Sequence, residues 1–484
     1  MEGKNMNKPD AGTLFGHPKG LFLLFGTEMW ERFGYYGMRA LLVLYLIASV
    51  EDGGFGWTRG EALGLYGTFT MAVYLTPLIG GWLADNYIGQ RKAIIYGGII
   101  FSLGYFTLGI PKSMIPGMEE SIFYLGLTLI IIGNGLFKAN VSSLVGDLYE
   151  EGDHRRDGAF TIFYMGINLG AFLSPLIVGP LGEQVNWHYG FIVAGCGMLI
   201  GLLLQLTLAN KYLGDIGVQP SAKRTKGVQK PDVPLTSDDY DRMKVILIMS
   251  MFSVIFWAGF EQAGGLFTIY ASDFTDRNLF GYEIAASSFQ SLNALFIILL
   301  APVIAAVWVK MGSKEPTSPK KFAYAMVFLA LGFFVMLWAT IVQGGDVSTK
   351  VSMLFLVFAY LFHTLGELCL SPIGLSMVTK LAPLKFTSLL MGIWFFFTAL
   401  SNKLAAFIGS FVGEGQEAVE NASTIFMAVG IAALITGVII FLSAGKLVEW
   451  MHGAEGDDSS DMESKLEEEL SVTGTHEAMP EKHT

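Results

Sequence analysis

The chain has 484 residues, of which 52% are hydrophobic and 15% are charged, and its mean hydropathy is +0.51. A soluble protein of this length carries about 25% charged residues, so the composition excludes an ordinary soluble domain and indicates a polytopic membrane protein. The net charge of −11 says little about partners, because the tail after residue 452, with ten acidic residues and two lysines, supplies most of it.

Twelve apolar segments follow one another, each long enough for a membrane-spanning helix of roughly 20 residues. They lie near residues 21–49, 61–85, 92–110, 121–146, 159–181, 189–211, 243–271, 287–310, 321–343, 351–379, 386–412 and 423–449. A polar stretch divides them into two groups of six. We therefore expect an all-α membrane protein with an N-terminal segment (1–20), two six-helix bundles (21–211 and 243–451), a linker (212–242) and a disordered acidic tail (452–484).

The positive charges of the loops indicate which ends of the segments face the cytoplasm. Fifteen Lys and Arg residues lie on one set of loops. The opposite set carries only four: Arg59, Lys112, Arg277 and Lys350. Because cytoplasmic loops are enriched in Lys and Arg, we expect both termini and the linker in the cytoplasm, with the chain crossing the cell (inner) membrane an even number of times.

The first apolar segment contains four ionisable side chains, at Glu28, Glu31, Arg32 and Arg39. Each costs about 2.5–3.5 kcal/mol at the centre of a membrane helix unless it is paired or faces an aqueous cavity. Their spacing of three, four and seven residues places them on one face of a helix, together with Tyr35. We expect this charged stripe to face the protein interior, which is typical of a transporter or a proton path.

The loop between the second and third segments starts with two glycines and contains Asp85 and Arg91. Its sequence resembles the G-x-L-A-D-x-x-G-x-[RK] loop of the major facilitator superfamily. Glycines at these positions allow close helix approach and a tight turn. The resemblance implies the major facilitator fold, and we expect Asp85 to pair with Arg91 as a latch on the cytoplasmic side.

Four blocks place polar side chains inside apolar segments. They read Glu28-x-x-Glu31-Arg32-Phe33-x-Tyr35-Tyr36-Gly37, Gly133-Asn134-Gly135-Leu136-Phe137-Lys138-Ala139-Asn140, Phe163-Tyr164-Met165-Gly166-Ile167-Asn168-Leu169-Gly170 and Gly366-Glu367-Leu368-x-x-Ser371-Pro372-x-Gly374-Leu375-Ser376. In this order they resemble the proton-coupled oligopeptide transporter (POT/PTR) family of that superfamily. The resemblance implies a twelve-helix importer of di- and tripeptides that is not an enzyme and uses protons, with no other cofactor and no metal.

A dipeptide is a zwitterion, so its site needs a cation, an anion or amide, and adaptable apolar walls. The resemblance implies that Arg39 and Lys138 hold the peptide carboxylate. It assigns the amino end to Asn168, Asn293 and Glu367. It places seven residues in the wall of the pocket: Tyr36, Tyr74, Tyr164, Trp257, Ser371, Trp394 and Phe395. Aromatic walls accommodate many side chains, although helix packing is the alternative for Trp394 and Phe395.

Proton coupling needs a titratable group whose state shifts the balance between outward-facing and inward-facing forms. We favour Glu28 or Glu31 as the proton carrier, because burial disfavours the charged form of a carboxylate. Arg32 and Lys138 complete this cluster. The resemblance supports the choice and leaves open which glutamate carries the proton.

The resemblance also implies two ion pairs between the halves of the chain. Arg39 with Glu261 would close the outer side, and Lys138 with Glu367 would close the inner side. Each pair would form in one state and break in the other, as expected for alternating access by two rocking bundles.

Three features depart from the family pattern or stay unassigned. Animal relatives carry a histidine in the second segment, where this chain reads Gly67-Thr68-Phe69-Thr70. His363, one turn before Glu367, is the nearest substitute, although a polar packing role is the alternative. Lys403 is expected to extend outward to water. The chain also lacks the two extra helices that many bacterial relatives carry between the halves.

Other functions are less consistent with the sequence. A transporter of another small anion, such as nitrate or a conjugated metabolite, is the alternative, but the charges at Arg39, Lys138 and Glu367 match a zwitterion. An intramembrane hydrolase needs a nucleophile–base pair or metal ligands, and no H-E-x-x-H motif occurs. We expect a monomer in the lipid bilayer with peptides, peptide-like drugs and protons as partners, and no nucleic acid.

Overall fold

The structure, a computed structural model, describes residues 12–150, 153, 155–221, 234–383, 385–415 and 417–454, except for the side chains of Ser313 and Ser388. The middle of the expected linker, residues 222–233, and the expected acidic tail from residue 455 onward lie outside the described residues. The regular secondary structure of the described chain is helical apart from three pairs of two-residue strands. The expectation of an all-α protein is therefore confirmed for this part of the chain.

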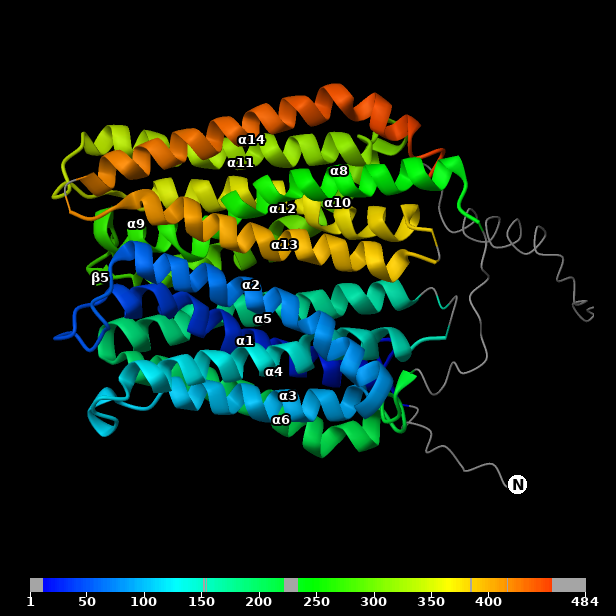
Figure 1. Ribbon diagram of the computed structural model, residues 1–484, viewed down its shortest axis with the longest axis horizontal. Coiled ribbons are helices and arrows are strands. Elements are labelled where there is room, and N and C mark those ends of the chain that lie inside the picture. The colour runs from blue at the N-terminus through cyan, green and yellow to red at the C-terminus, as the bar shows by residue number, and fades with distance from the viewer. Residues whose placement is uncertain are drawn as a thin grey trace, which may run out of the picture.

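The first half of the described chain forms one group of helices, in the lower part of Figure 1. Its α-helices are α1 (Lys19–Ile47), α2 (Arg59–Leu83), α3 (Gln90–Leu108), α4 (Glu119–Asp147), α5 (Arg155–Pro180) and α6 (Trp187–Tyr212). Short helical turns join them: η1 (Ala84–Ile88), η2 (Lys112–Met114) and η3 (Leu181–Val185). A small hairpin of β1 (Thr13–Leu14) and β2 (His17–Pro18) precedes α1.

The second half forms a separate group above the first in Figure 1. Its α-helices are α8 (Ser237–Phe260), α9 (Leu266–Phe274), α10 (Ser291–Met311), α11 (Ser318–Gln343), α12 (Leu354–Leu381), α13 (Thr387–Gly409) and α14 (Glu417–Glu449). The connecting 3-10 turns are η4 (Glu261–Gly264), η5 (Ala286–Gln290), η6 (Gly312–Lys314) and η7 (Ser410–Val412). β3 (Thr275–Asp276) pairs with β6 (Val351–Ser352), and β4 (Asn278–Leu279) pairs with β5 (Tyr282–Glu283).

Ten helical stretches in the described residues are long and apolar enough to cross a membrane. The protein is therefore a polytopic membrane protein. The two other long helices, α1 and α3, fall outside this set for reasons visible in their sequences. Every 18-residue stretch of α1 contains at least three charged residues, and α3 begins with Gln90-Arg91-Lys92.

One predicted segment is broken. The sequence suggests a continuous helix over residues 243–271, but α8 ends at Phe260 and the chain continues as the 3-10 turn η4 before α9 begins at Leu266. Gly264 and Gly265 follow one another at this break. Glycine is a poor helix former, so the pair favours an interruption of the helix here.

The helices run between two ends of the molecule (Figure 1). We call the end that holds residues 12–18, 234–236 and 450–454 the proximal end. The opposite end, which holds residues 48–58, 181–186, 275–290 and 410–415, is the distal end. The first and last described residues thus lie at the same end, as an even number of crossings requires.

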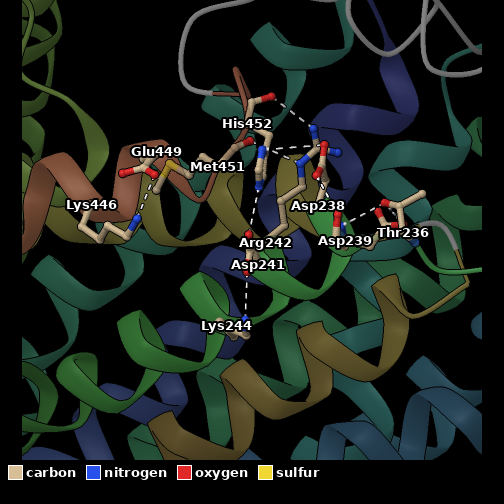
Figure 2. A network of polar contacts seen from close by, with 11 residues as sticks. Thr236, Asp238, Asp239, Asp241, Arg242, Lys244, Lys446, Glu449, Met451 and His452 are labelled. Carbon is tan, nitrogen blue, oxygen red and sulfur yellow. Dashed lines mark hydrogen bonds and ion pairs between the residues drawn. The ribbon is translucent and has the colours of Figure 1, made fainter.

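At the proximal end, the turn after α14 is fixed to the start of α8 (Figure 2). Arg242 donates hydrogen bonds to the carbonyl oxygens of Met451 and His452, both at 3.2 Å. The imidazole Nε2 of His452 lies 3.2 Å from the carboxylate of Asp241, which also pairs with Lys244 at 2.9 Å. These contacts close the second bundle by joining its last helix to its first.

Small residues let helices approach closely where lipid supplies no hydrophobic driving force between them. A methyl group at Gly80 of α2 would collide with the carbonyl of Gly135 in α4. On the other side of α2, a methyl group at Gly67 would collide with Ala406 of α13. α2 therefore packs within its own bundle and also against the second bundle.

Candidate functional site

The charged stripe of α1 is buried and internally paired. Glu28, Glu31 and Arg32 are 2%, 0% and 3% exposed. The guanidinium of Arg32 donates to Glu31, and its Nε lies 3.1 Å from Oε1 of Glu28. Arg32 is therefore shared by two carboxylates. When one of them takes up a proton, Arg32 becomes available to pair fully with the other.

Lys138 brings a second cation close to this cluster from α4. Its ammonium lies over the ring of Tyr74 in α2, 4.5 Å from the ring centroid. It is within electrostatic reach of Glu28 and Glu31 but forms no ion pair with either. The aromatic ring stabilises the cation and leaves the ammonium available to another anion.

Arg39 lies farther along α1 and contacts the second bundle. Its Nε donates to the hydroxyl of Tyr66 at 2.6 Å, and its Nη2 donates to the carboxylate of Glu261. Glu261 is the first residue of η4, where the predicted helix breaks. Gly264 is required here, because a methyl group at this position would lie 2.8 Å from Nη2 of Arg39. The sequence-predicted contact between Arg39 and Glu261 is present in this conformation.

On the second bundle, Glu367 of α12 has a neutral partner. The amide Nδ2 of Asn293 in α10 donates to the carboxylate of Glu367 at 2.8 Å and to the hydroxyl of Thr364 at 3.1 Å. Among the described residues, Glu367 forms no ion pair with Lys138. Of the two predicted ion pairs between the halves, Arg39–Glu261 is therefore formed in this conformation and Lys138–Glu367 is not.

The predicted wall residues differ in exposure. Tyr164 is 39% exposed, and the side-chain amide of Asn168 donates to its carbonyl oxygen at 2.9 Å. Tyr36, Tyr74, Trp257, Ser371 and Phe395 are all partly exposed. Trp394 is only 4% exposed and packs against Gly374 and Phe322. The structure therefore places Trp394 in helix packing, the alternative raised from the sequence.

The expected latch between Asp85 and Arg91 is not formed. Asp85 accepts a hydrogen bond from the hydroxyl of Ser221 at 2.7 Å. Arg91 donates to the carbonyl oxygen of Gly214 and to the side-chain oxygen of Asn210, both at 2.6 Å. In this conformation Arg91, in the first turn of α3, extends instead toward the end of α6 and the turn that follows it, so the role of the two residues as a latch stays a prediction.

Arg59 is a charged contact between the bundles that the sequence analysis did not assign. It lies at the start of α2, and its guanidinium donates to Asp273 of α9 and to the carbonyl of Gly413 at 3.1 Å. Glu414 lies 3.5 Å from its Nε. The only signal in the sequence was that Arg59 is one of four cations on otherwise cation-poor loops.

Lys403 of α13 contacts the first bundle. Its ammonium lies 2.7 Å from the hydroxyl of Thr68, an exposed residue, and 3.3 Å from the carbonyl oxygen of Gly64, both in α2. Lys403 is therefore another contact between the bundles. Its expected extension to water stays a prediction.

His363 is packed among aromatic rings. It is 2% exposed, and its ring centroid lies 5.4 Å from that of Phe267 and 4.9 Å from that of Phe333. Neither ring nitrogen makes a hydrogen bond of normal geometry among the described residues. This environment favours the packing role over a role in proton transfer.

The polar contacts between the bundles share a location. Those that join described residues of α1–α6 to described residues of α8–α14 involve Arg39, Arg59, Gly64, Thr68, Pro175, Glu183 and Gln184 on the first bundle. All of these residues lie in the distal half of their helices or in the distal turns. The described molecule is therefore held together at the distal end.

Comparison with known proteins shows which family the chain resembles. The model of the POT family matches residues 91–213 and 235–429. The chain belongs to the POT family.

Two curated relatives of this POT family member are named as transporters. A peptide transporter of Yersinia enterocolitica, YePEPT, is 36% identical over 94% of this chain and 99% of its own length. A di-/tripeptide transporter of Lactococcus lactis subsp. cremoris is 31% identical over 93% of this chain and 99% of its own. A crystal structure of a mutant peptide transporter POT in complex with alafosfalin superimposes with a TM-score of 0.84 at 37% identity, over 92% and 98% of the two chains.

Proposed function

We propose that the protein imports di- and tripeptides, and peptide-like drugs, by proton symport across the cell membrane. The observation that carries this proposal is the distribution of charge inside the fold. Cations at Arg39 and Lys138 lie on the first bundle, and the Asn293–Glu367 pair lies on the second. A zwitterion placed between the bundles meets a cation on one side and an anion with an amide on the other. Family membership and the names of the relatives support the same substrate class.

In this proposal all twelve long helices cross the membrane, α8 together with α9 forming one of them, and the proximal end faces the cytoplasm. The excess of Lys and Arg on the proximal loops supports this orientation. The functional unit is a monomer, since each chain contains both halves of the site.

Peptide binding uses both bundles. Arg39 and Lys138 hold the carboxylate, and Glu367, Asn168 and Asn293 hold the amino end. Tyr36, Tyr74, Tyr164, Trp257, Ser371 and Phe395 form the adaptable wall, with Trp394 supporting it from behind. Partial exposure of the wall residues supports their access to a solute.

Coupling places the proton on Glu28 or Glu31. Protonation removes the negative charge of one glutamate, so that glutamate no longer attracts Arg32. Arg32 then pairs with the other glutamate alone, and the electrostatic attraction between the cluster and Lys138 becomes weaker. Lys138 is then available to the peptide carboxylate or to Glu367. The present conformation, joined at the distal end and with Lys138 and Glu367 apart, corresponds to a state open toward the cytoplasm.

Proteoliposome uptake tests the proposal. The purified protein is reconstituted and supplied with labelled dialanine under an imposed pH gradient, acidic outside. We expect accumulation that a protonophore abolishes and that excess unlabelled dipeptide, but not nitrate or free alanine, inhibits. Accumulation of nitrate instead of dialanine would overturn the substrate assignment in favour of the small-anion alternative.

A further inference from the structure

A groove on the surface of the first bundle combines charged and aromatic side chains. It has a volume of about 450 Å³ and lies between the starts of α2 and α4, at the distal end. Its lining includes Trp57, Glu61, Gly64, Thr68, Glu120 and Tyr124. None of these residues has a part in the proposed transport mechanism, so the groove calls for a role of its own.

The groove faces away from the proposed peptide site. The hydroxyl of Tyr66 binds Arg39 inside the molecule. Gly64 and Thr68 each lie two residues from Tyr66, and two residues of an α-helix are about 200° apart, so the groove occupies the opposite face of α2. Thr68 is exposed, and Tyr124 of α4 is 44% exposed. When the long helices cross a membrane, this face meets lipid near the headgroups of the distal leaflet.

Lys403 of α13 brings an ammonium group to the groove without an anion. The ammonium binds the hydroxyl of Thr68 at 2.7 Å and the carbonyl oxygen of Gly64 at 3.3 Å. Both acceptors are neutral, and Lys403 forms no ion pair within the described part of the chain. Because a charged side chain within a membrane-spanning segment is normally paired or hydrated, the groove offers this cation to an anionic group.

Glu61 and Glu120 bring two exposed carboxylates to the groove without a cation. Thr58 donates its backbone N–H at 3.0 Å and its hydroxyl at 2.8 Å, both to Oε2 of Glu61. Oε1 of Glu61 is therefore left for another donor, and neither carboxylate has an ion pair among the residues that the structure describes. The rings of Trp57 and Tyr124, with centroids 6.3 Å apart, line the same groove. Aromatic faces attract cations, so these four side chains together favour a cationic group.

The charges follow the order of a zwitterionic phospholipid. Glu61 and Glu120 lie in the first turns of α2 and α4, at the distal end. Thr68, which binds Lys403, is seven residues farther along α2, or about 10 Å deeper in the membrane. Ile79, three turns farther on the same face of α2, is apolar and 67% exposed. From the surface inward, the groove thus presents anions, then a cation, then an apolar path for an acyl chain.

We propose that this groove binds the headgroup of phosphatidylethanolamine in the distal leaflet. Its phosphate binds Lys403 and Thr68, because an ammonium pairs with a phosphodiester anion. Its ammonium binds Glu61 and Glu120, to which it donates N–H hydrogen bonds. Phosphatidylcholine has no such donors, and phosphatidylglycerol has no cation. The inference rests on the proposed function only for placing the long helices in the membrane.

Native mass spectrometry of the purified full chain measures this binding. Phosphatidylethanolamine, phosphatidylcholine and phosphatidylglycerol with identical acyl chains are titrated separately into the protein in detergent. The intensities of free and lipid-bound protein give the Kd of the first bound lipid. We expect phosphatidylethanolamine to bind at least about tenfold more tightly than the other two lipids, because it alone makes hydrogen bonds from its ammonium to the carboxylates.

Glu61→Gln combined with Glu120→Gln is the decisive variant. Both side chains are exposed, so the change leaves the core intact. Phosphatidylethanolamine should lose its advantage over phosphatidylcholine, because neutral amides do not attract the ammonium. Lys403→Met should instead weaken both lipids alike, by about tenfold, because both have the phosphate. Glu283→Gln, at a distal carboxylate that is 62% exposed, is the matched control and should keep the preference of the parent.

Equal affinities of the parent for phosphatidylethanolamine and phosphatidylcholine would overturn the site. A preference for phosphatidylethanolamine that persists in the double variant would also overturn it. Because a dipeptide is a zwitterion as well, the affinity for dialanine is measured in the same variants, and we expect it to be unchanged. Loss of dialanine binding in the double variant, with an unchanged lipid preference, would assign the groove to peptide instead. The lipid titrations contain no peptide, so a failure of dialanine uptake would count against the proposed function alone.

Discussion

Arg39 and Glu261 form an ion pair between residues 222 positions apart in the sequence, one on α1 and one at the break after α8. Both side chains are at least 92% buried, and the hydroxyl of Tyr66 provides the arginine with a second partner. The pair joins the two bundles beside the proposed peptide site. Any state that opens the distal end has to supply Arg39 with another anion, and a peptide carboxylate is suited to this role.

Removing the carboxylate of Glu261 should therefore destabilise the protein. Glu261→Ala leaves a buried guanidinium without its charged partner, and breaking such a pair typically costs about 3–5 kcal/mol. We expect a clear loss of thermal stability in detergent, measured by fluorescence-detected size exclusion, and at least tenfold slower uptake. Glu261→Gln, which keeps a hydrogen-bond acceptor, should lose less.

The matched control is Glu283→Ala. Its carboxylate pairs with Arg277 but is 62% exposed, and exposed pairs contribute about 0–1 kcal/mol. An equal loss of stability in Glu261→Ala and Glu283→Ala would contradict a special role for the buried pair.

The glutamates that share Arg32 should separate coupling from binding. In Glu28→Gln and Glu31→Gln, proton-driven uptake of dialanine should be abolished, because the side chain can no longer exchange a proton. Counterflow, in which labelled peptide exchanges for unlabelled peptide without a pH gradient, should persist in part. The two variants together indicate which carboxylate carries the proton.

Normal gradient-driven accumulation in both variants would contradict the assignment of the proton to this cluster. Glu283→Gln, at an exposed carboxylate in β5, serves as the neutral comparison.

The sequence predicted the parts of this structure that depend on local pattern. Long apolar runs predicted the helices closely, because a membrane span has to satisfy its backbone within itself. The stripe of Glu28, Glu31 and Arg32 followed from helical spacing alone. Contacts that join distant segments were not accessible in this way. Nothing local indicates that Arg59 meets Asp273 or that Lys403 meets Thr68, since these depend on how two bundles are placed.

Two further features differ from what neighbouring residues suggest. Asp85 and Arg91 are close in sequence and opposite in charge, but in this conformation Asn210 and Gly214, at and after the end of α6, bind Arg91 instead. The break at Glu261 was missed although Gly264 and Gly265 mark it in the sequence, because the apolar run that resumes at Leu266 extends the predicted segment past the two glycines.

The proposed inner ion pair makes a prediction about the opposite state. Lys138 and Glu367 are apart here, with Lys138 over Tyr74 and Glu367 bound by Asn293. If they meet when the proximal end closes, Lys138→Ala and Glu367→Ala should each reduce uptake at least tenfold, whereas Asn293→Ala should mainly weaken peptide affinity. Uptake kinetics and peptide-induced thermal stabilisation separate these effects, and wild-type behaviour in both charge variants would contradict the gate.

The imidazole of His363 is expected to be dispensable for both stability and uptake, unlike the charged groups above. The imidazole is buried against Phe267, Phe333 and Gly332 without a hydrogen bond of normal geometry. A buried polar group left unsatisfied costs about 1–3 kcal/mol, and an apolar side chain of similar size removes that cost. His363→Leu should therefore be at least as stable to heat as the parent and should keep its gradient-driven uptake and pH profile. Loss of proton-driven uptake with counterflow intact would instead place His363 on the proton path, one turn from Glu367.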